Sequence, residues 1–270
     1  QGFEVDIAPV DEKGFVDVEA LASLIRSDTT LVSVMAVNNE IGSIQPIQAI
    51  SELLADKPTI SFHVDAVQAL AKIPTEKYLT ERVDFATFSS HKFHGVRGVG
   101  FVYIKSGKKI TPLLTGGGQE LDYRSTTENV AGIAATAKAL RLAMEKLDIF
   151  TSKTGQMKSV IRQALLDYPD IFVFSDEKGF APHILTFGIK GVRGEVIVHA
   201  FEDYDIFIST TSACSSKAGK PAGTLIAMRV DKDKAQSAVR LSLDLENDMS
   251  QIEQFLTKLK LIYNQTRKVR

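Results

Sequence analysis

The sequence contains one cysteine and no tryptophan among its 270 residues. A single cysteine excludes an intrachain disulfide, which is consistent with a reducing compartment. No apolar run reaches the length that a membrane-spanning helix needs, and the first residues lack the pattern of a signal peptide. These absences predict a cytoplasmic protein that does not bind a membrane.

A large charge of one sign is also lacking. The chain carries 32 Lys and Arg against 33 Asp and Glu, for a formal net charge of -1. This balance argues against nucleic acid or an anionic surface as the main partner. Hydrophobic residues make up 44% of the chain and charged residues 24%, which is typical of a globular protein with a substantial core.

Strand-like and helix-like patterns alternate through the first half. This alternation predicts an α/β fold with a mainly parallel sheet. The predicted strand at residues 99–104 closely follows the one at 85–90, which favours an antiparallel pairing of these two strands. The short apolar, β-branched runs that predict strands lie at residues 30–37, 60–65, 85–90 and 99–104, and a helix is predicted at 46–55 with Pro46 in its first turn.

The second half shows a different order of predicted helices and strands. A helical pattern covers residues 128–146, after the glycines at 116–118, and an α+β pattern follows it. We therefore expect a large domain over residues 1–145 and a smaller C-terminal domain over 146–270. Within the latter we predict strands at 171–174, 184–189, 206–209 and 239–243, and helices at 153–166, 194–201 and 248–263.

Polar residues follow the predicted parallel strands, where ligands of such sheets gather. Asp65 ends one strand, and Lys92 follows the next after a spacing that fits one helical crossover. A cofactor such as pyridoxal phosphate needs a lysine for a Schiff base, a carboxylate for its pyridine nitrogen and donors for its phosphate. Ser89, His91 and the amides of their turn are suited to the phosphate.

These residues admit two other interpretations. His63, Asp65, His91 and His94 could together suggest zinc, but the strand-end geometry and the adjacent lysine fit a metal poorly. We therefore expect no metal. His63 itself fits either a core histidine or a support for Asp65, and both stay open.

Six motifs follow one another along the chain. They are residues 37–42 (VNNEIG), 63–68 (HVDAVQ), 89–92 (SSHK) with Gly95, 116–120 (GGGQE) leading into 124–129 (RSTTEN), 212–216 (SACSS) and 239–243 (VRLSL). Taken together, they resemble the NifS/IscS-type cysteine desulfurases, which are class V, fold-type I pyridoxal-phosphate enzymes. The resemblance covers essentially the whole chain. Each motif is weak alone, but their shared order is specific.

For the cofactor, the resemblance implies a role for each matching residue. Lys92 would bind pyridoxal phosphate as a Schiff base and later move the α-proton of the substrate. Asp65 would pair with the pyridinium nitrogen, and Gln68 would hydrogen-bond the phenolic oxygen. Ser89 and His91 would bind the phosphate.

For the substrate, the resemblance implies that Asn39 lies beside the ring and the carboxylate of L-cysteine. Arg240 would clamp this carboxylate, a task suited to a guanidinium. Cys214 would attack the substrate sulfur, which leaves a persulfide on the enzyme and releases L-alanine. Thr127 would reach the phosphate bound by the other subunit, which implies a homodimer.

The sequence around Cys214 is consistent with a sulfur carrier. Residues 210–223 are rich in Ser, Thr, Gly, Lys and Ala, which predicts an exposed, mobile loop. Lys217 and Lys220 favour the thiolate form. The loop differs from that of the housekeeping iron–sulfur-cluster enzymes, so between a cluster scaffold and a tRNA-thiolation sulfurtransferase we favour the latter as sulfur acceptor.

The sequence also departs from the family pattern. Family members carry a portion ahead of the position of Gln1, with a phosphate-binding threonine turn and a histidine that stacks on the ring. We therefore expect a fragment of low activity rather than a complementing partner chain. Thr126 stands where the family more often has glycine. Selenocysteine lyase, an aminotransferase and a non-catalytic dimerising remnant stay open as alternatives.

Overall fold

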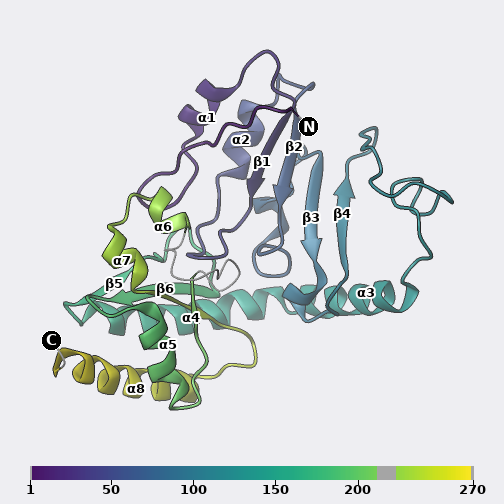
Figure 1. Ribbon diagram of the computed structural model, residues 1–270. Helices are drawn as coiled ribbons and strands as arrows, with labels where there is room; N and C mark the ends of the chain where they lie inside the picture. The colour runs from purple at the N-terminus through teal and green to yellow at the C-terminus, as the bar shows by residue number, and fades with distance from the viewer. Residues whose placement is uncertain (1, 212–222, 269–270) are drawn as a thin grey trace. The chain divides into compact units, whose positions relative to one another are not determined.

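The structure is a computed structural model that describes residues 2–211 and 223–268 (Figure 1). The chain divides into two compact units. The parallel-sheet unit comprises Ser27–Ala36 and Ile47–Leu147, and the antiparallel-sheet unit comprises Gln1–Arg26, Val37–Pro46 and Asp148–Arg270. The predicted domains, 1–145 and 146–270, stay a prediction, because the compact units are not continuous in sequence.

The parallel-sheet unit contains four strands in the order β1-β2-β3-β4 (Figure 1). The first three run parallel, and β4 pairs antiparallel with β3. This confirms the predicted α/β class and the antiparallel pairing. The strands are β1 (Leu31–Met35), β2 (Ser61–Asp65), β3 (Phe85–Ser89) and β4 (Gly100–Ile104).

The helices of this unit follow local signals in the sequence. Helix α2 (Ile47–Leu53) directly follows Pro46, and its residues Ile47 and Ile50 are buried on one stripe. Helix α3 (Val130–Met144) begins where the Asn129 side chain accepts a hydrogen bond from the Gly132 amide. Two 3-10 helices, η1 (Thr75–Lys77) and η2 (Ser90–Phe93), complete the unit.

A buried carboxylate ties the loops of the parallel-sheet unit together. Asp84 is 2% exposed and accepts hydrogen bonds from the Phe62 amide at 2.9 Å and from Arg82 Nη1 at 2.7 Å. Burial would raise the pKa of Asp84, but these bonds and a bond from Lys108 outweigh it and lower the pKa. Arg82 also donates to the carbonyls of residues 54, 57 and 60.

The antiparallel-sheet unit holds four strands in the order β5-β6-β8-β7, all paired antiparallel. The strands are β5 (Ile171–Val173), β6 (Ile184–Ile189), β7 (Ser209–Thr210) and β8 (Ala238–Ser242). Its helices are α1 (Val18–Leu24), α4 (Leu147–Leu166), α5 (Gly194–Glu202), α6 (Gly223–Ala227), α7 (Lys232–Gln236) and α8 (Met249–Lys268). The first residue of α4, Leu147, is the last residue of the parallel-sheet unit.

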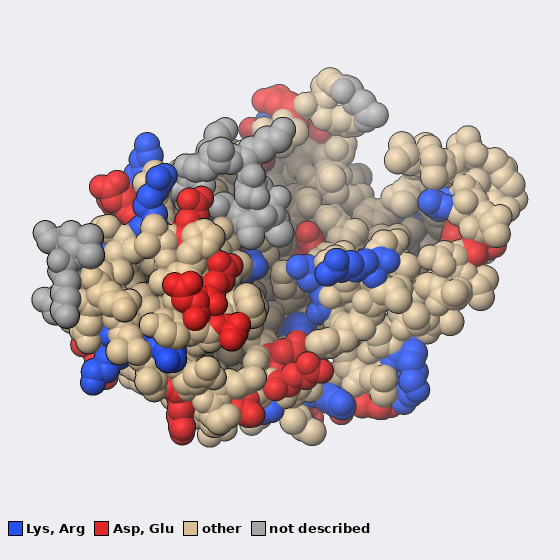
Figure 2. Space-filling model, turned by 60° about the horizontal axis from the view of Figure 1, so that its bottom comes forward, with Lys and Arg blue, Asp and Glu red and all other residues tan. Residues whose placement is uncertain are grey.

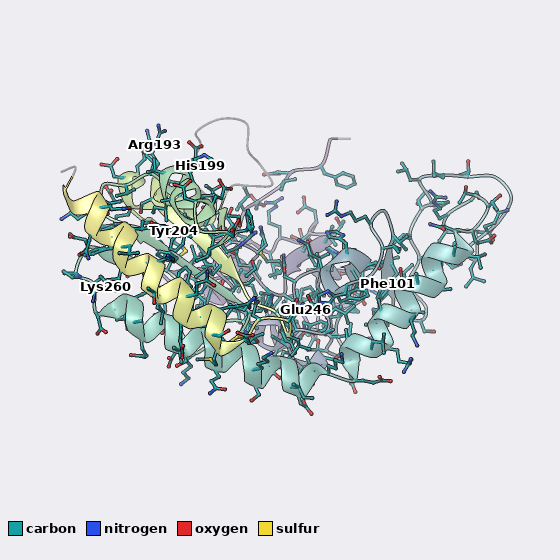
Figure 3. The ribbon with its side chains drawn as sticks, turned by 90° about the horizontal axis from the view of Figure 1, so that it is seen from below. Phe101, Arg193, His199, Tyr204, Glu246 and Lys260 are labelled. Atoms are coloured by element: carbon teal, nitrogen blue, oxygen red, sulfur yellow. The ribbon has the colours of Figure 1, made fainter. Side chains whose placement is uncertain are left out.

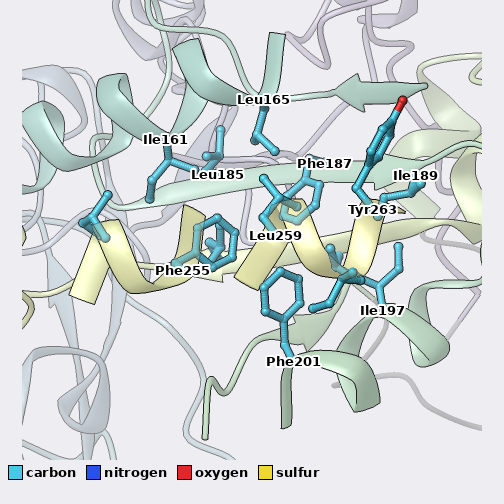
Figure 4. Packing of buried hydrophobic residues seen from close by; sticks show 14 of the residues in the cluster. Ile161, Leu165, Leu185, Phe187, Ile189, Ile197, Phe201, Phe255, Leu259 and Tyr263 are labelled. Atoms are coloured by element: carbon cyan, nitrogen blue, oxygen red, sulfur yellow. The ribbon is translucent and has the colours of Figure 1, made fainter. Parts of the chain in front are cut away.

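One hydrophobic core holds α4, α5 and α8 against this sheet (Figure 4). Along α8, Phe255 and Leu259 are four residues apart and both buried, so one stripe of the helix faces the core. Phe255 stacks on Phe201 of α5, with ring centroids 4.9 Å apart. Each such buried side chain stabilises the fold by roughly 1.5–3 kcal/mol relative to exposure.

Several predicted elements have different bounds in the structure, and two of these differences concern where an element begins or joins the sheet. Helix α4 begins at Leu147, several residues before the predicted start at 153. Strand β7 covers only Ser209–Thr210, not 206–209. The reason is local: Asp205 has φ 57°, and the Ile206 amide donates to Phe201 O, so these residues end α5 instead of joining the sheet.

Among residues 2–211 and 223–268, no helix combines the length and the apolar character needed to cross a membrane. On the face that Figure 2 shows, acidic and basic side chains are interspersed with other residues, and neither charge covers the face. This distribution agrees with the near balance of acidic and basic residues in the sequence.

Candidate cofactor and substrate site

Asp65 and Lys92 lie at the same edge of the parallel sheet. Asp65 is the last residue of β2, and Lys92 belongs to η2, which directly follows β3. The two strands pair parallel, with Asp65 opposite Thr87. The structure therefore brings the predicted carboxylate and the predicted lysine to neighbouring strand ends, where ligands of such sheets bind.

The turn after β2 holds Asp65 in place. Its Oδ1 accepts a hydrogen bond from the Val67 amide at 3.0 Å, and its carbonyl accepts one from the Ala36 amide at 2.7 Å. The carboxylate is exposed, so it can meet a ligand. Gln68 follows in the same turn and is half-buried.

The η2 turn presents the residues predicted for the phosphate. Ser89 ends β3 and is half-buried, while His91 is exposed and Lys92 is half-buried. Ser90 is buried beneath the turn, where its Oγ accepts a hydrogen bond from Thr136 Oγ1 at 2.9 Å. The Ser89 hydroxyl, the His91 imidazole and the Lys92 amine, together with the Asp65 carboxylate, match the donors and charges that pyridoxal phosphate requires.

Gly95 allows the η2 turn to close. Its amide donates to Ser90 O at 3.0 Å, and a Cβ at this position would lie 1.9 Å from Ser90 Oγ. Only glycine fits without a shift of the turn. The glycine that the sequence places after Lys92 is therefore needed to shape the segment that carries Lys92.

His63 forms a hydrogen-bonded row across three strands. Its Nδ1 bonds Ser33 Oγ at 2.8 Å, and its Nε2 bonds Thr87 Oγ1 at 3.1 Å. Burial lowers the pKa of His63, which the nearby Asp65 carboxylate partly opposes, so the ring is neutral near pH 7. Because His63 and Asp65 are two residues apart on β2, both point to the same face.

In the antiparallel-sheet unit, the structure brings Asn39 and Arg240 together across about 200 residues of chain. Arg240 Nη1 donates to Asn39 O at 2.7 Å, and Nη2 donates to Ser209 Oγ at 3.2 Å. Both predicted residues are half-buried. This contact gives the guanidinium a defined orientation.

Two further predicted residues stand apart from these contacts. Thr127 is exposed, in the segment that leads into α3. Cys214, Lys217 and Lys220 lie outside the described residues, and so does most of the predicted loop 210–223. Their roles stay predictions.

Sequence reasoning did not identify the residues that hold Asn39 and Arg240 in place. Ser209 Oγ accepts a hydrogen bond from Arg240, and Thr186 donates to the carbonyl of Glu40, the residue after Asn39. No local pattern marks partners that lie so far apart in the chain. Asn38 had a readable signal, because an Asn side chain often accepts from backbone amides two or three residues further on and so closes a turn, as Asn38 does with Glu40 and Ile41. Within the part of the chain that the structure describes, no group of three or more His, Cys, Asp or Glu is arranged to hold a metal ion.

Comparison with known proteins decides the family. The model of the family described as Aminotransferase class-V matches residues 1–255. The chain belongs to the class-V aminotransferase family. The similarity to cysteine desulfurases, predicted from the motifs, is confirmed by relatives named cysteine desulfurase. The class-V aminotransferase family depends on pyridoxal phosphate.

The relatives match over nearly all of this chain. A NifS/IcsS protein homolog from Lactobacillus delbrueckii subsp. bulgaricus is 50% identical over 269 residues, which are 99% of this chain and 70% of that protein. The cysteine desulfurase IscS of Clostridium botulinum is 39% identical over 272 residues, 100% of this chain and 68% of that protein. The chain thus spans 68% to 70% of the length of these relatives.

Solved structures confirm the fold. A NifS-like protein matches with a TM-score of 0.89 and 37% identity, over 97% of this chain and 69% of that one. A NifS-like protein from Rickettsia africae matches with a TM-score of 0.85 and 30% identity, over 95% of this chain and 69% of that one. The predicted fold-type I pyridoxal-phosphate architecture is therefore correct.

Proposed function

We propose that this chain carries the catalytic residues of a cysteine desulfurase, which uses pyridoxal phosphate to convert L-cysteine into L-alanine and a persulfide on Cys214. The observation that carries the proposal is the position of Asp65 and Lys92 at the ends of adjacent parallel strands. The names of the relatives support the choice of reaction.

The residues of the parallel-sheet unit would bind and activate the cofactor. Pyridoxal phosphate, when bound, supplies an electron sink conjugated to the α-carbon of the substrate. Lys92 would hold the cofactor through its Nζ and would then take up and return the α-proton. The Asp65 carboxylate would keep the pyridine nitrogen protonated through its opposite charge, and Gln68 would donate to the phenolic oxygen. Ser89 and His91 would donate to the phosphate.

The residues of the antiparallel-sheet unit would bind the substrate. Arg240 pairs with the substrate carboxylate, and its contacts with Asn39 and Ser209 keep the guanidinium from rotating. Asn39 lies beside the same carboxylate. This arrangement selects an α-amino acid, while the choice of cysteine depends on Cys214.

The sulfur step needs no external oxidant or reductant. The Cys214 thiolate attacks the substrate sulfur, so an S–S bond forms as the Cβ–S bond breaks. The electron pair of that bond goes to the substrate carbon, which takes up a proton and becomes the methyl group of alanine. The persulfide then passes its outer sulfur to an acceptor.

We further propose a cytoplasmic homodimer that delivers sulfur to an acceptor protein, either a cluster scaffold or a tRNA sulfurtransferase. Thr127 of each subunit would reach the phosphate at the other site. Exposed apolar side chains near Thr127 support a contact surface here: Leu121 is 88% exposed and Val130 is 71% exposed. Sedimentation would give a dimer mass, and a monomer at micromolar concentration would contradict this.

A trapping experiment tests the proposal. The chain is incubated with pyridoxal phosphate, reduced with borohydride and digested, and we expect the cofactor mass on the peptide that carries Lys92. Lys92→Ala should lose this adduct. Equal labelling of many lysines, unaffected by Lys92→Ala, would refute the cofactor assignment.

The reaction is then assayed with L-cysteine. Because we expect a fragment of low activity, we expect alanine and a persulfide on Cys214 to form slowly, and Cys214→Ser should abolish both. If Cys214→Ser left product formation unchanged, an aminotransferase would be favoured, because a transaminase needs no thiol. Faster turnover of L-selenocysteine, also insensitive to Cys214→Ser, would favour a selenocysteine lyase.

A further inference from the structure

The turn at residues 38–43, here called the anchor turn, is closed by its own first side chain. Asn38 is 5% exposed, and its Oδ1 accepts hydrogen bonds from the amides of Glu40 at 2.9 Å and Ile41 at 3.0 Å. Gly42 has φ +84°, a conformation that favours glycine, and its amide donates to Asn38 O. The anchor turn is therefore a defined structure in its own right.

A row of side chains from the antiparallel sheet holds the main chain of the anchor turn. Arg240 on β8 donates to Asn39 O, and Thr186 on β6 donates to Glu40 O at 2.5 Å. Thr186 and Ser209 both lie opposite Arg240 in the sheet, so the three residues form one row across β6, β8 and β7. The anchor turn and the guanidinium therefore hold each other in place.

The same turn also holds the chain beyond the cysteine-bearing segment. Asn38 Nδ2 donates to Thr224 Oγ1 at 3.1 Å, and Glu40 Oε2 accepts from the Thr224 amide at 3.1 Å. Thr224 lies in α6, directly after residues 212–222, which include Cys214. The bond to Glu40 is charge-assisted, which makes it stronger than a neutral one.

We propose that Asn38 and Glu40 are positioning residues, which set the end of the cysteine-bearing segment at Thr224 in register with Asn39 and Arg240. The inference rests on the proposed function and deepens it. Sulfur transfer requires the Cys214 sulfur to meet the substrate sulfur while Arg240 holds the substrate carboxylate. A displacement of about 1 Å between such groups can cost about 100-fold in rate.

Neither Asn38 nor Glu40 is assigned to touch the substrate. Asn39 and Arg240 bind it, and the two flanking side chains act through Thr224. Loss of the Glu40 carboxylate should therefore change the sulfur step more than substrate binding. A purely structural role would instead destabilise the whole unit.

Glu40→Ala and Glu40→Gln test this, because the glutamine amide oxygen can still accept from Thr224. Thr224→Val removes only the hydroxyl that Asn38 uses. Asn38→Ala is avoided, since its loss opens the anchor turn. The matched control is Glu246→Ala, an exposed glutamate between β8 and α8 that Figure 3 labels.

The first readout needs no cofactor. We expect Glu40→Ala to speed hydrogen exchange at the Thr224 amide by about tenfold or more, as for one lost charge-assisted bond. Because Cys214 is the only cysteine, its alkylation rate reports on its own segment, and this rate should change several-fold in Glu40→Ala. Thr224→Val should change it in the same direction. Glu40→Gln and Glu246→Ala should stay close to wild type.

The second readout is turnover of L-cysteine with pyridoxal phosphate. Glu40→Ala should lower kcat by about tenfold while KM stays close to wild type, and Glu40→Gln should restore kcat. Equal exchange at Thr224 in Glu40→Ala and Glu246→Ala would overturn the proposal. So would faster exchange throughout the unit with an unchanged alkylation rate. If wild type itself forms no alanine, the proposed function fails, and the exchange and alkylation results still decide the role of Glu40.

Discussion

Lys158 lies in the interior of the antiparallel-sheet unit, on α4, and is 3% exposed. Its Nζ donates to Ala181 O at 2.8 Å and lies 5.5 Å from the centroid of the Phe180 ring. Burial and, to a smaller extent, the nearby Arg162 charge lower the pKa of Lys158 from 10.5 to about 8, although Asp176 and Glu177 act in the opposite direction.

The sign of the effect on stability follows from proton binding. Below pH 8 the Lys158 amine is protonated in both states, and the folded state bears the cost of a buried charge. Between the folded pKa of about 8 and the unfolded value of 10.5, only the unfolded state holds the proton, so the free energy of unfolding rises with pH. A gap of about 2.5 pKa units corresponds to a rise of about 3 kcal/mol.

Lys158→Met removes this titration and keeps a flexible apolar side chain in its place. Urea unfolding, followed by far-UV circular dichroism, would be measured for wild type and variant from about pH 7 to about pH 11. The difference in unfolding free energy, wild type minus variant, should rise by about 3 kcal/mol across this range. The exposed Lys178→Met is the control and should give a flat difference. A flat difference for Lys158→Met as well would refute the assigned burial of the charge.

Three further changes have defined outcomes. Asp84→Asn should cost about 3 kcal/mol in urea unfolding because it leaves the half-buried Arg82 without its carboxylate, and equal stabilities at neutral pH would argue against the ion pair. Since the Asp84 pKa is lowered, its contribution in wild type is present above about pH 4 and is lost as pH falls below it. Gly95→Ala should shift the η2 turn through its clash with Ser90 and lower borohydride trapping on Lys92 by about tenfold, with trapping at the wild-type level as the contrary result. Phe255→Ala should cost about 3–5 kcal/mol by the same unfolding assay, because its ring is buried against Phe201, and a loss below about 1 kcal/mol would show that the core is packed differently.

The sequence by itself determined the elements whose cause is local. Short apolar runs predicted β2 and β4, and a helical pattern over residues 248–263 predicted most of α8. The joint position of Asp65 and Lys92 was also predictable, because parallel strands joined by one crossover end at the same edge of a sheet. These features depend on residues that are close in sequence or on the geometry of a single crossover between parallel strands, although the crossover from β2 to β3 contains only the 3-10 helix η1 and not the predicted full helix.

Only the tertiary structure decided the contacts that join distant segments. The bonds from Arg240 to Asn39 and from Thr224 to Glu40 span most of the chain, and no periodicity predicts them. The same holds for the burial of Lys158, a residue type that is usually exposed. Hydrogen-bond partners and burial depend on which surfaces meet after folding, whereas the local pattern of the sequence specifies only which face of each element is apolar.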